Sequence, residues 1–82
     1  MSEMRSVTLY GRPGCCLCDD ARAMLERLHE RLPFSLQECD IESDDALHAA
    51  YLERIPVISI DGRECFELVI DEQELERALI DR

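Results

Sequence analysis

The sequence contains no tryptophan, and aromatic residues make up only 5% of its 82 residues. A hydrophobic core must therefore consist mainly of Leu, Ile, Val and Ala, and the hydrophobic fraction of 46% suffices for one compact domain. No apolar run has the length of a transmembrane helix, and the first residues lack the basic and apolar regions of a signal peptide. We therefore expect a single domain over residues 1–82, located in the cytoplasm.

Positive charge is also scarce. Nine Lys and Arg residues stand against nineteen Asp and Glu residues, which gives a formal net charge of -10. A protein that binds nucleic acid or an anionic membrane needs a basic surface, so the sequence argues against both kinds of partner. An acidic surface is most simply a solvated one, and we expect a monomer.

The hydrophobic pattern predicts seven secondary-structure elements. Short runs rich in β-branched and aromatic residues predict strands over residues 6–10, 34–39, 57–60 and 64–70. Apolar residues at helical spacing predict helices over residues 17–32, from Ser43 as N-cap to Arg54, and from Asp71 onward. Asp61-Gly62 predicts a tight hairpin between the last two strands. The order β-α-β-α-β-β-α predicts an α/β domain with the thioredoxin fold, a four-stranded mixed sheet flanked by three helices.

Cysteine is abundant and unevenly distributed. Three of the five cysteines lie within four residues, at Cys15, Cys16 and Cys18, which indicates reactivity or metal binding rather than structural cross-linking. Cys15 and Cys18 are one helical turn apart at the start of the first predicted helix, so their Cα atoms should lie ~5–6 Å apart, within the range that a disulfide requires. Such a disulfide closes a very small loop and adds little stability, which favours a chemical role.

The start of a helix favours the thiolate form of Cys15. Unpaired backbone N–H groups and the positive end of the helix dipole point toward its sulfur, and Arg12 in the preceding loop adds positive charge. Asp19 and Asp20 oppose this effect. A thiolate at Cys15 can attack a substrate disulfide, and Cys18 can then resolve the mixed disulfide by forming the Cys15–Cys18 bond.

The stretch from Val7 to Asp19, with Leu-Tyr followed by Cys-x-Leu-Cys-Asp, resembles the opening of the small glutaredoxin-like family. Residues 54–57, Arg-Ile-Pro-Val, are similar to the segment in which thioredoxin-fold proteins carry a cis-proline opposite the active cysteines. The hairpin and the short final helix match as well, so the likeness covers nearly the whole chain.

The resemblance implies a thiol–disulfide oxidoreductase in which Cys15 attacks and Cys18 resolves. It implies a cis bond before Pro56, which shapes the substrate groove, and pairing of the Ile55 backbone with a bound peptide or glutathione. We expect Arg12 to bind substrate at the same site. The implied substrates are disulfide-containing proteins or glutathione mixed disulfides, with no bound cofactor and with glutathione as a candidate reductant.

Two features depart from the patterns of related families. Glutaredoxins usually have a Gly-Gly and an acidic residue after the fourth strand, where this chain has Glu-Leu-Val-Ile-Asp-Glu at residues 67–72. Thioredoxins usually keep a buried acid in the strand before the motif, where this chain has Val-Thr-Leu-Tyr. We therefore expect weak glutathione binding and slow thioredoxin-like turnover.

Two alternative functions remain open. A zinc or iron–sulfur protein could use the Cys15-Cys16-Leu17-Cys18 cluster, although a second cysteine pair or a paired His/Cys motif is missing from the sequence. A binding module could use the same groove without turnover. Cys16 is interpreted as a passenger. Cys39 and Cys65 are interpreted as core or near-core cysteines, and His29 and His48 as solvent-facing histidines.

Overall fold

The computed structural model describes residues 5–80, and these form the seven predicted elements and one short 3-10 helix. The strands are β1 (Arg5–Gly11), β2 (Phe34–Asp40), β3 (Val57–Ile60) and β4 (Arg63–Glu67). The helices are α1 (Cys16–His29), α2 (Asp45–Tyr51) and α3 (Glu72–Ile80), and the 3-10 turn is η1 (Ile41–Ser43). The sheet order is β2-β1-β3-β4, with β1 parallel to β2 and β3 antiparallel to both β1 and β4. This is the predicted α/β thioredoxin-like fold.

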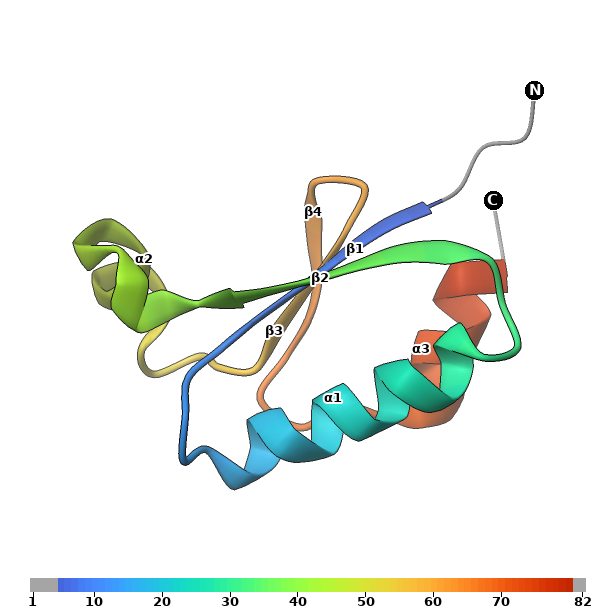
Figure 1. Cartoon of the computed structure of the whole chain (residues 1–82), viewed down its shortest axis with the longest axis horizontal. Helices are drawn as coiled ribbons and strands as arrows, with labels where there is room; N and C mark the ends of the chain where they lie inside the picture. The colour runs from blue at the N-terminus through green and yellow to red at the C-terminus, as the bar shows by residue number, and fades with distance from the viewer. Residues whose placement is uncertain (1–4, 81–82) are drawn as a thin grey trace.

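The main core lies between the sheet and the two longer helices, α1 and α3, which lie on the same side of the sheet (Figure 1). Successive side chains of a strand face opposite sides, so alternate residues of β1 and β3 enter this layer. The core is largely aliphatic, as the composition predicts. Its members include Val7 and Leu9 of β1, Ile58 and Ile60 of β3, Leu25 and Leu28 of α1, and Leu75 and Leu79 of α3.

The predicted hairpin between β3 and β4 is confirmed. Asp61 and Gly62 both have positive φ, at 54° and 85°, which is the conformation that a two-residue hairpin turn favours. Asp61 also anchors the turn to the start of β1, because its N–H donates to the Ser6 carbonyl at 2.7 Å and its Oδ1 accepts from the Ser6 N–H at 2.9 Å.

The N-cap of α2 differs from the prediction. Asp44, not Ser43, precedes the helix, and its Oδ1 accepts the N–H groups of Ala46 at 2.7 Å and Leu47 at 3.3 Å. Ser43 belongs to η1, where its hydroxyl donates to the Asp40 carbonyl at 2.6 Å. The 3-10 turn between β2 and α2 therefore moves the start of the helix by one residue. In Figure 1, α2 lies at the end of the sheet where β2 terminates.

The environments of two cysteines and two histidines refine the sequence interpretation. Cys65 is exposed on the edge strand β4, so its prediction as a core cysteine is wrong, while Cys39 on β2 is half-buried. His29 is exposed and its ring packs against Phe34 with centroids 4.9 Å apart. His48 is half-buried, so it faces solvent only in part. An edge strand such as β4 has a neighbouring strand on one side only, so its residues can stay exposed. The sequence pattern does not show which strand lies at the edge.

Candidate functional site

Cys15 and Cys18 occupy two different environments within one turn of α1. Cys15 is the N-cap of the helix, with φ -96° and ψ 113°, and its Sγ accepts the backbone N–H of Cys18 at 3.3 Å. A thiol sulfur here takes the place of the oxygen in a Ser or Asp cap, and it satisfies one of the free N–H groups at the helix start. Cys15 is half-buried, whereas Cys18 is only 1% exposed. The outer sulfur is therefore accessible and the inner one is enclosed directly behind it.

Burial changes the acidity of the inner thiol. The pKa of Cys18 is raised from an ordinary value of 9.0 to about 11, first by burial and then by hydrogen bonding with the Cys15 side chain. The charges of Cys15 and Asp19 raise this pKa as well, and a backbone hydrogen bond at Arg12 lowers it. Cys18 therefore remains a neutral thiol under conditions in which a free cysteine begins to ionise.

Gly11 makes the enclosure of Cys18 possible, and the sequence analysis did not identify it. A Cβ at position 11 would lie 2.9 Å from the Cys18 Sγ and 3.1 Å from the Cys18 Cβ. Real Cβ atoms essentially never approach a neighbour at 2.9 Å, so β1 must end in glycine for the helix to sit this close. The available signal was a glycine immediately after an apolar strand and just before the cysteine motif.

The predicted cis-proline segment lies beside the cysteines. The Ile55–Pro56 peptide bond is cis, and both residues are buried. Ile55 belongs to a second small core with Cys18 and Ile41, against which Cys15 also packs. The structure therefore brings Cys15, Cys18 and Ile55 together, as the resemblance implies.

The Ile55 backbone is only partly free for a substrate. Its N–H donates to the Tyr51 carbonyl at 3.1 Å, which leaves the Ile55 carbonyl as the group able to accept a hydrogen bond from a bound strand. The residue after β4 holds the neighbouring backbone in place, because the Leu68 N–H donates to the carbonyls of Pro56 at 2.9 Å and Arg54 at 3.2 Å. The proline loop is thus held on both sides before any substrate binds.

A polar network fixes the end of α2 onto β4. The guanidinium of Arg54 forms ion pairs with Glu64 at 2.7 Å and with Glu67 at 2.8 Å, and it lies over the Tyr51 ring at 5.2 Å from the centroid. The Tyr51 hydroxyl donates to Glu64 and is the main reason that the pKa of Glu64 is lowered. Tyr51 also packs against Tyr10 of β1, with ring centroids 4.9 Å apart. Sequence reasoning missed this network, because it joins residues that are distant in the chain.

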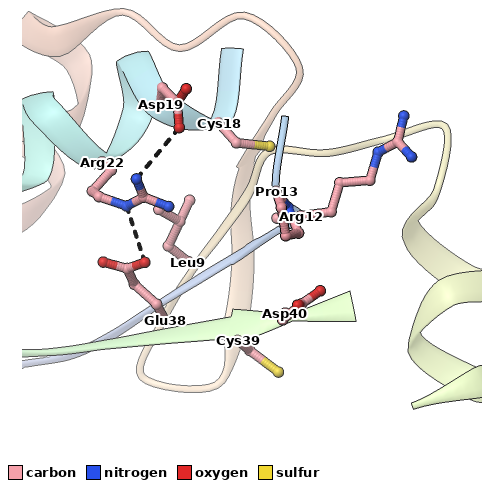
Figure 2. A pocket seen from close by; sticks show the side chains of 10 residues that line it. Leu9, Arg12, Pro13, Cys18, Asp19, Arg22, Glu38, Cys39 and Asp40 are labelled. Atoms are coloured by element: carbon pink, nitrogen blue, oxygen red, sulfur yellow. Dashed lines mark hydrogen bonds and ion pairs between the residues drawn. The ribbon is translucent and has the colours of Figure 1, made fainter. Parts of the chain in front are cut away.

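Arg12 is oriented away from Cys18 (Figure 2). Its guanidinium lies 3.7 Å from a Glu42 carboxylate oxygen, and Figure 2 shows the side chain extending away from Cys18. A pocket of ≈ 440 Å³ lies between the start of α1 and the end of β2 (Figure 2). Arg22 spans one wall of this pocket, with ion pairs to Glu38 at 3.0 Å and to Asp19 at 3.3 Å. The cations next to this pocket are therefore already paired with carboxylates.

The segment that replaces the expected Gly-Gly has an unusual backbone. Leu68, directly after β4, has φ 65°, a left-handed conformation that L-residues with a side chain adopt at a cost. Leu68 and Val69 are also exposed, at 42% and 81%. The chain thus keeps a glycine-like turn here without a glycine, and this turn carries two exposed apolar side chains.

Within residues 5–80, no group of three or more His, Cys, Asp or Glu side chains is arranged to hold a metal ion. Cys16 is exposed, and all five cysteines are free thiols. In the same part of the chain, no helix is both long enough and apolar enough to cross a membrane.

The comparisons with known proteins agree with this geometry. Residues 6–80 match the family model described as glutaredoxin-like domain (DUF836). A protein of Mycobacterium tuberculosis named as uncharacterised is 31% identical, with 84% of this chain and 76% of that protein covered. The chain thus matches most of a curated relative whose own role is not stated.

Solved structures give the same answer for the fold. The solution structure of a Nitrosomonas europaea protein matches with a TM-score of 0.80 and 28% identity, over 96% of this chain and 95% of that one. A crystal structure of a protein from X. campestris matches with a TM-score of 0.75 and 30% identity, over 89% and 93%. Thioredoxin from Halobacterium salinarum has the same fold, with a TM-score of 0.71 and 22% identity over 92% and 71%. The chain belongs to the glutaredoxin-like domain family and has a thioredoxin-like fold.

Proposed function

We propose that the protein is a thiol–disulfide oxidoreductase that works by dithiol exchange through Cys15 and Cys18. The observation that carries this proposal is the pairing of an accessible N-cap sulfur with an enclosed one, joined by the 3.3 Å contact from the Cys18 N–H to the Cys15 Sγ. A purely structural N-cap needs no sulfur, and a binding groove needs no second thiol behind the first.

The reaction has two exchange steps. The Cys15 thiolate attacks one sulfur of a substrate disulfide, forms a mixed disulfide and releases the other sulfur as a thiolate. Cys18 then loses its proton and attacks the Cys15 sulfur, which releases the second substrate thiolate and leaves the Cys15–Cys18 disulfide. Two electrons pass from the protein dithiol to the substrate disulfide, and the two protons of the protein thiols go to the released thiolates. A small thiol such as glutathione, or a dithiol, returns the protein to its reduced form.

The surrounding residues orient the substrate. Pro56 and Ile55 form the buried floor beside the cysteines, and the Ile55 carbonyl accepts a hydrogen bond from an extended substrate strand. Leu68 and Val69 supply apolar contact next to this floor. Arg12 contributes through its pairing with Glu42, which sets the charge near the motif, and its side chain extends away from Cys18 (Figure 2).

The proposal is tested with variants in which one cysteine is replaced by serine, and with a small neutral disulfide as substrate. Cys15→Ser should abolish exchange, because it removes the attacking sulfur. Cys18→Ser should stop after the first step and accumulate a mixed disulfide on Cys15, which mass spectrometry of the intact protein detects. Cys16→Ser is the matched control, since Cys16 lies between the two residues in the sequence and is exposed, and it should retain exchange.

A redox titration in glutathione buffers completes the test. A reversible two-electron couple between Cys15 and Cys18, at roughly -200 to -300 mV, supports an exchange enzyme. Loss of activity in Cys16→Ser equal to that in Cys15→Ser refutes the assigned roles. A chain that shows no couple and reacts with no disulfide is instead a binding module.

A further inference from the structure

Resting on the proposed function, we propose that this site selects disulfides whose flanking groups are positively charged and discriminates against anionic disulfides such as oxidised glutathione. The basis is the charge around the cysteines, where three nearby arginines are paired with carboxylates of the protein itself and the starts of η1 and α2 are capped by carboxylates, while α1 is capped by the Cys15 sulfur.

The first observation concerns the arginines on the elements that build the site. Arg12 precedes the motif, Arg22 lies on α1, and Arg54 is the first residue of the cis-proline segment. A carboxylate recognises a guanidinium best when that group is not already paired. All three are paired within the chain: Arg12 with Glu42 at 3.7 Å, Arg22 with Glu38 at 3.0 Å and Asp19 at 3.3 Å, and Arg54 with Glu64 at 2.7 Å and Glu67 at 2.8 Å.

The second observation concerns the helix starts, where free N–H groups could otherwise bind a carboxylate. At α2 the Asp44 carboxylate caps the helix, and at η1 the Asp40 carboxylate accepts the Glu42 N–H at 2.8 Å. An anionic substrate would need free backbone N–H groups at these helix starts, and it finds them already bonded to carboxylates of the protein.

The third observation is the excess of negative charge at this end of the molecule. The start of α1, the end of β2, η1 and α2 lie together at one end of the fold, opposite α3 and the end of α1 (Figure 1). Several carboxylates on these elements are exposed to solvent. They are Asp19, Asp20, Asp40, Glu42, Asp44 and Asp45.

Charges of this kind act on a substrate before contact. At low ionic strength the potential of an acidic surface extends about 10 Å or more, and it accelerates or slows the encounter with a charged partner by roughly tenfold or more. Salt shortens this range. Discrimination by charge must therefore be strongest at low ionic strength and weaken as salt is added.

The test compares two small disulfides of opposite charge at pH 7. Cystamine carries two ammonium groups and 3,3′-dithiodipropionate carries two carboxylates. The rate of mixed-disulfide formation on Cys15 is measured for each by rapid quenching and mass spectrometry. Dividing the ratio of the two rates by the same ratio for 2-mercaptoethanol removes the intrinsic reactivity of the disulfides. We expect a corrected ratio of about ten in favour of cystamine at low ionic strength, falling at least about threefold in roughly 0.5 M salt.

Two charge variants locate the effect. Glu42→Gln removes an exposed carboxylate and frees Arg12 near the motif, and it should lower the corrected ratio by about two- to threefold. Glu76→Gln changes the net charge equally, but it affects the pair with Arg31 beyond the far end of α1. That control should leave the ratio unchanged.

The possible results separate this inference from the proposed function. A corrected ratio near one, or an equal change in both variants, overturns the charge selection while exchange itself stands. A protein that reacts with neither charged disulfide nor with a neutral one refutes the proposed function.

Discussion

Replacing Gly11 by alanine tests directly whether the close packing of β1 against α1 sets the environment of Cys18. The new Cβ would lie 2.9 Å from the Cys18 Sγ, and the inner thiol has no exposed side to move toward because it is only 1% exposed. Overpacking of a buried site typically costs ~1–3 kcal/mol, and the lower entropy of the unfolded alanine chain returns ~0.4–1 kcal/mol. We expect Gly11→Ala to destabilise the protein by ~1–2 kcal/mol.

A double-mutant cycle isolates the contact responsible. Cys18→Ala removes the closer of the two contacts and leaves the one at 3.1 Å with the Cβ of residue 18, so Gly11→Ala should cost ~1 kcal/mol less in that background than in the wild type. Urea unfolding of the wild type, both single variants and the double variant gives the coupling free energy, for which we expect ~1 kcal/mol. Equal costs of Gly11→Ala in the two backgrounds would refute the packing argument.

The same substitution should alter the chemistry. A displaced Cys18 sulfur is misaligned with the Cys15 sulfur, so resolution should slow and a mixed disulfide should accumulate on Cys15. Gly14→Ala is the control, because Gly14 has φ 80° with nothing within 4 Å of the added Cβ. It should cost ~1 kcal/mol through backbone strain alone and leave the resolution step unchanged. Slower resolution in both variants would show that general destabilisation is responsible.

Two further predictions concern Cys18 and the turn after β4. Between pH 9.0 and the Cys18 pKa of about 11, the folded protein holds a proton that the unfolded chain has lost, so the contribution of Cys18 to stability is complete below pH 9 and disappears toward pH 11. Urea unfolding from pH 8 to 10.5 should therefore show a steeper loss of stability in the wild type than in Cys18→Ala, and parallel curves would contradict this. At Leu68, with φ 65°, glycine should be better tolerated than alanine, and Leu68→Gly should exceed Leu68→Ala in stability by ~0.5–1 kcal/mol in thermal unfolding. The opposite order would show that the turn is not strained.

The sequence predicts the fold well because its local signals agree with the tertiary structure. The Asp61-Gly62 pair requires a turn that matches the twist of the flanking strands, and the structure has it. The prediction fails where two local options are nearly equal, as at Ser43 and Asp44, which are both good N-caps. The choice depends on η1, which is stabilised by a contact back to Asp40 that periodicity does not reveal.

For the site as well, the sequence reveals the residues whose role follows from local spacing and misses those whose role depends on distant contacts. Cys15 and Cys18 are visible because their spacing is local, and the cis-proline segment is visible through a family resemblance. Gly11 and Arg54 were missed, because their roles depend on elements that meet only in the folded chain. Cys65 was assigned to the core because apolar content alone does not show which strand lies at the edge of the sheet.

In the proposed reaction, a buried thiol with a high pKa has to act as the resolving group without an acid in β1. Two of the causes that raise the pKa of Cys18 belong to Cys15, namely its side-chain hydrogen bond and its charge. Once Cys15 has formed a mixed disulfide, it carries no charge, and that repulsion ends. Burial then remains as the main cause, so the pKa of Cys18 falls at the stage of the reaction that needs its thiolate. The proposed reaction thus has an inner thiol that is protonated in the resting protein and that is easier to ionise once a substrate is attached to Cys15.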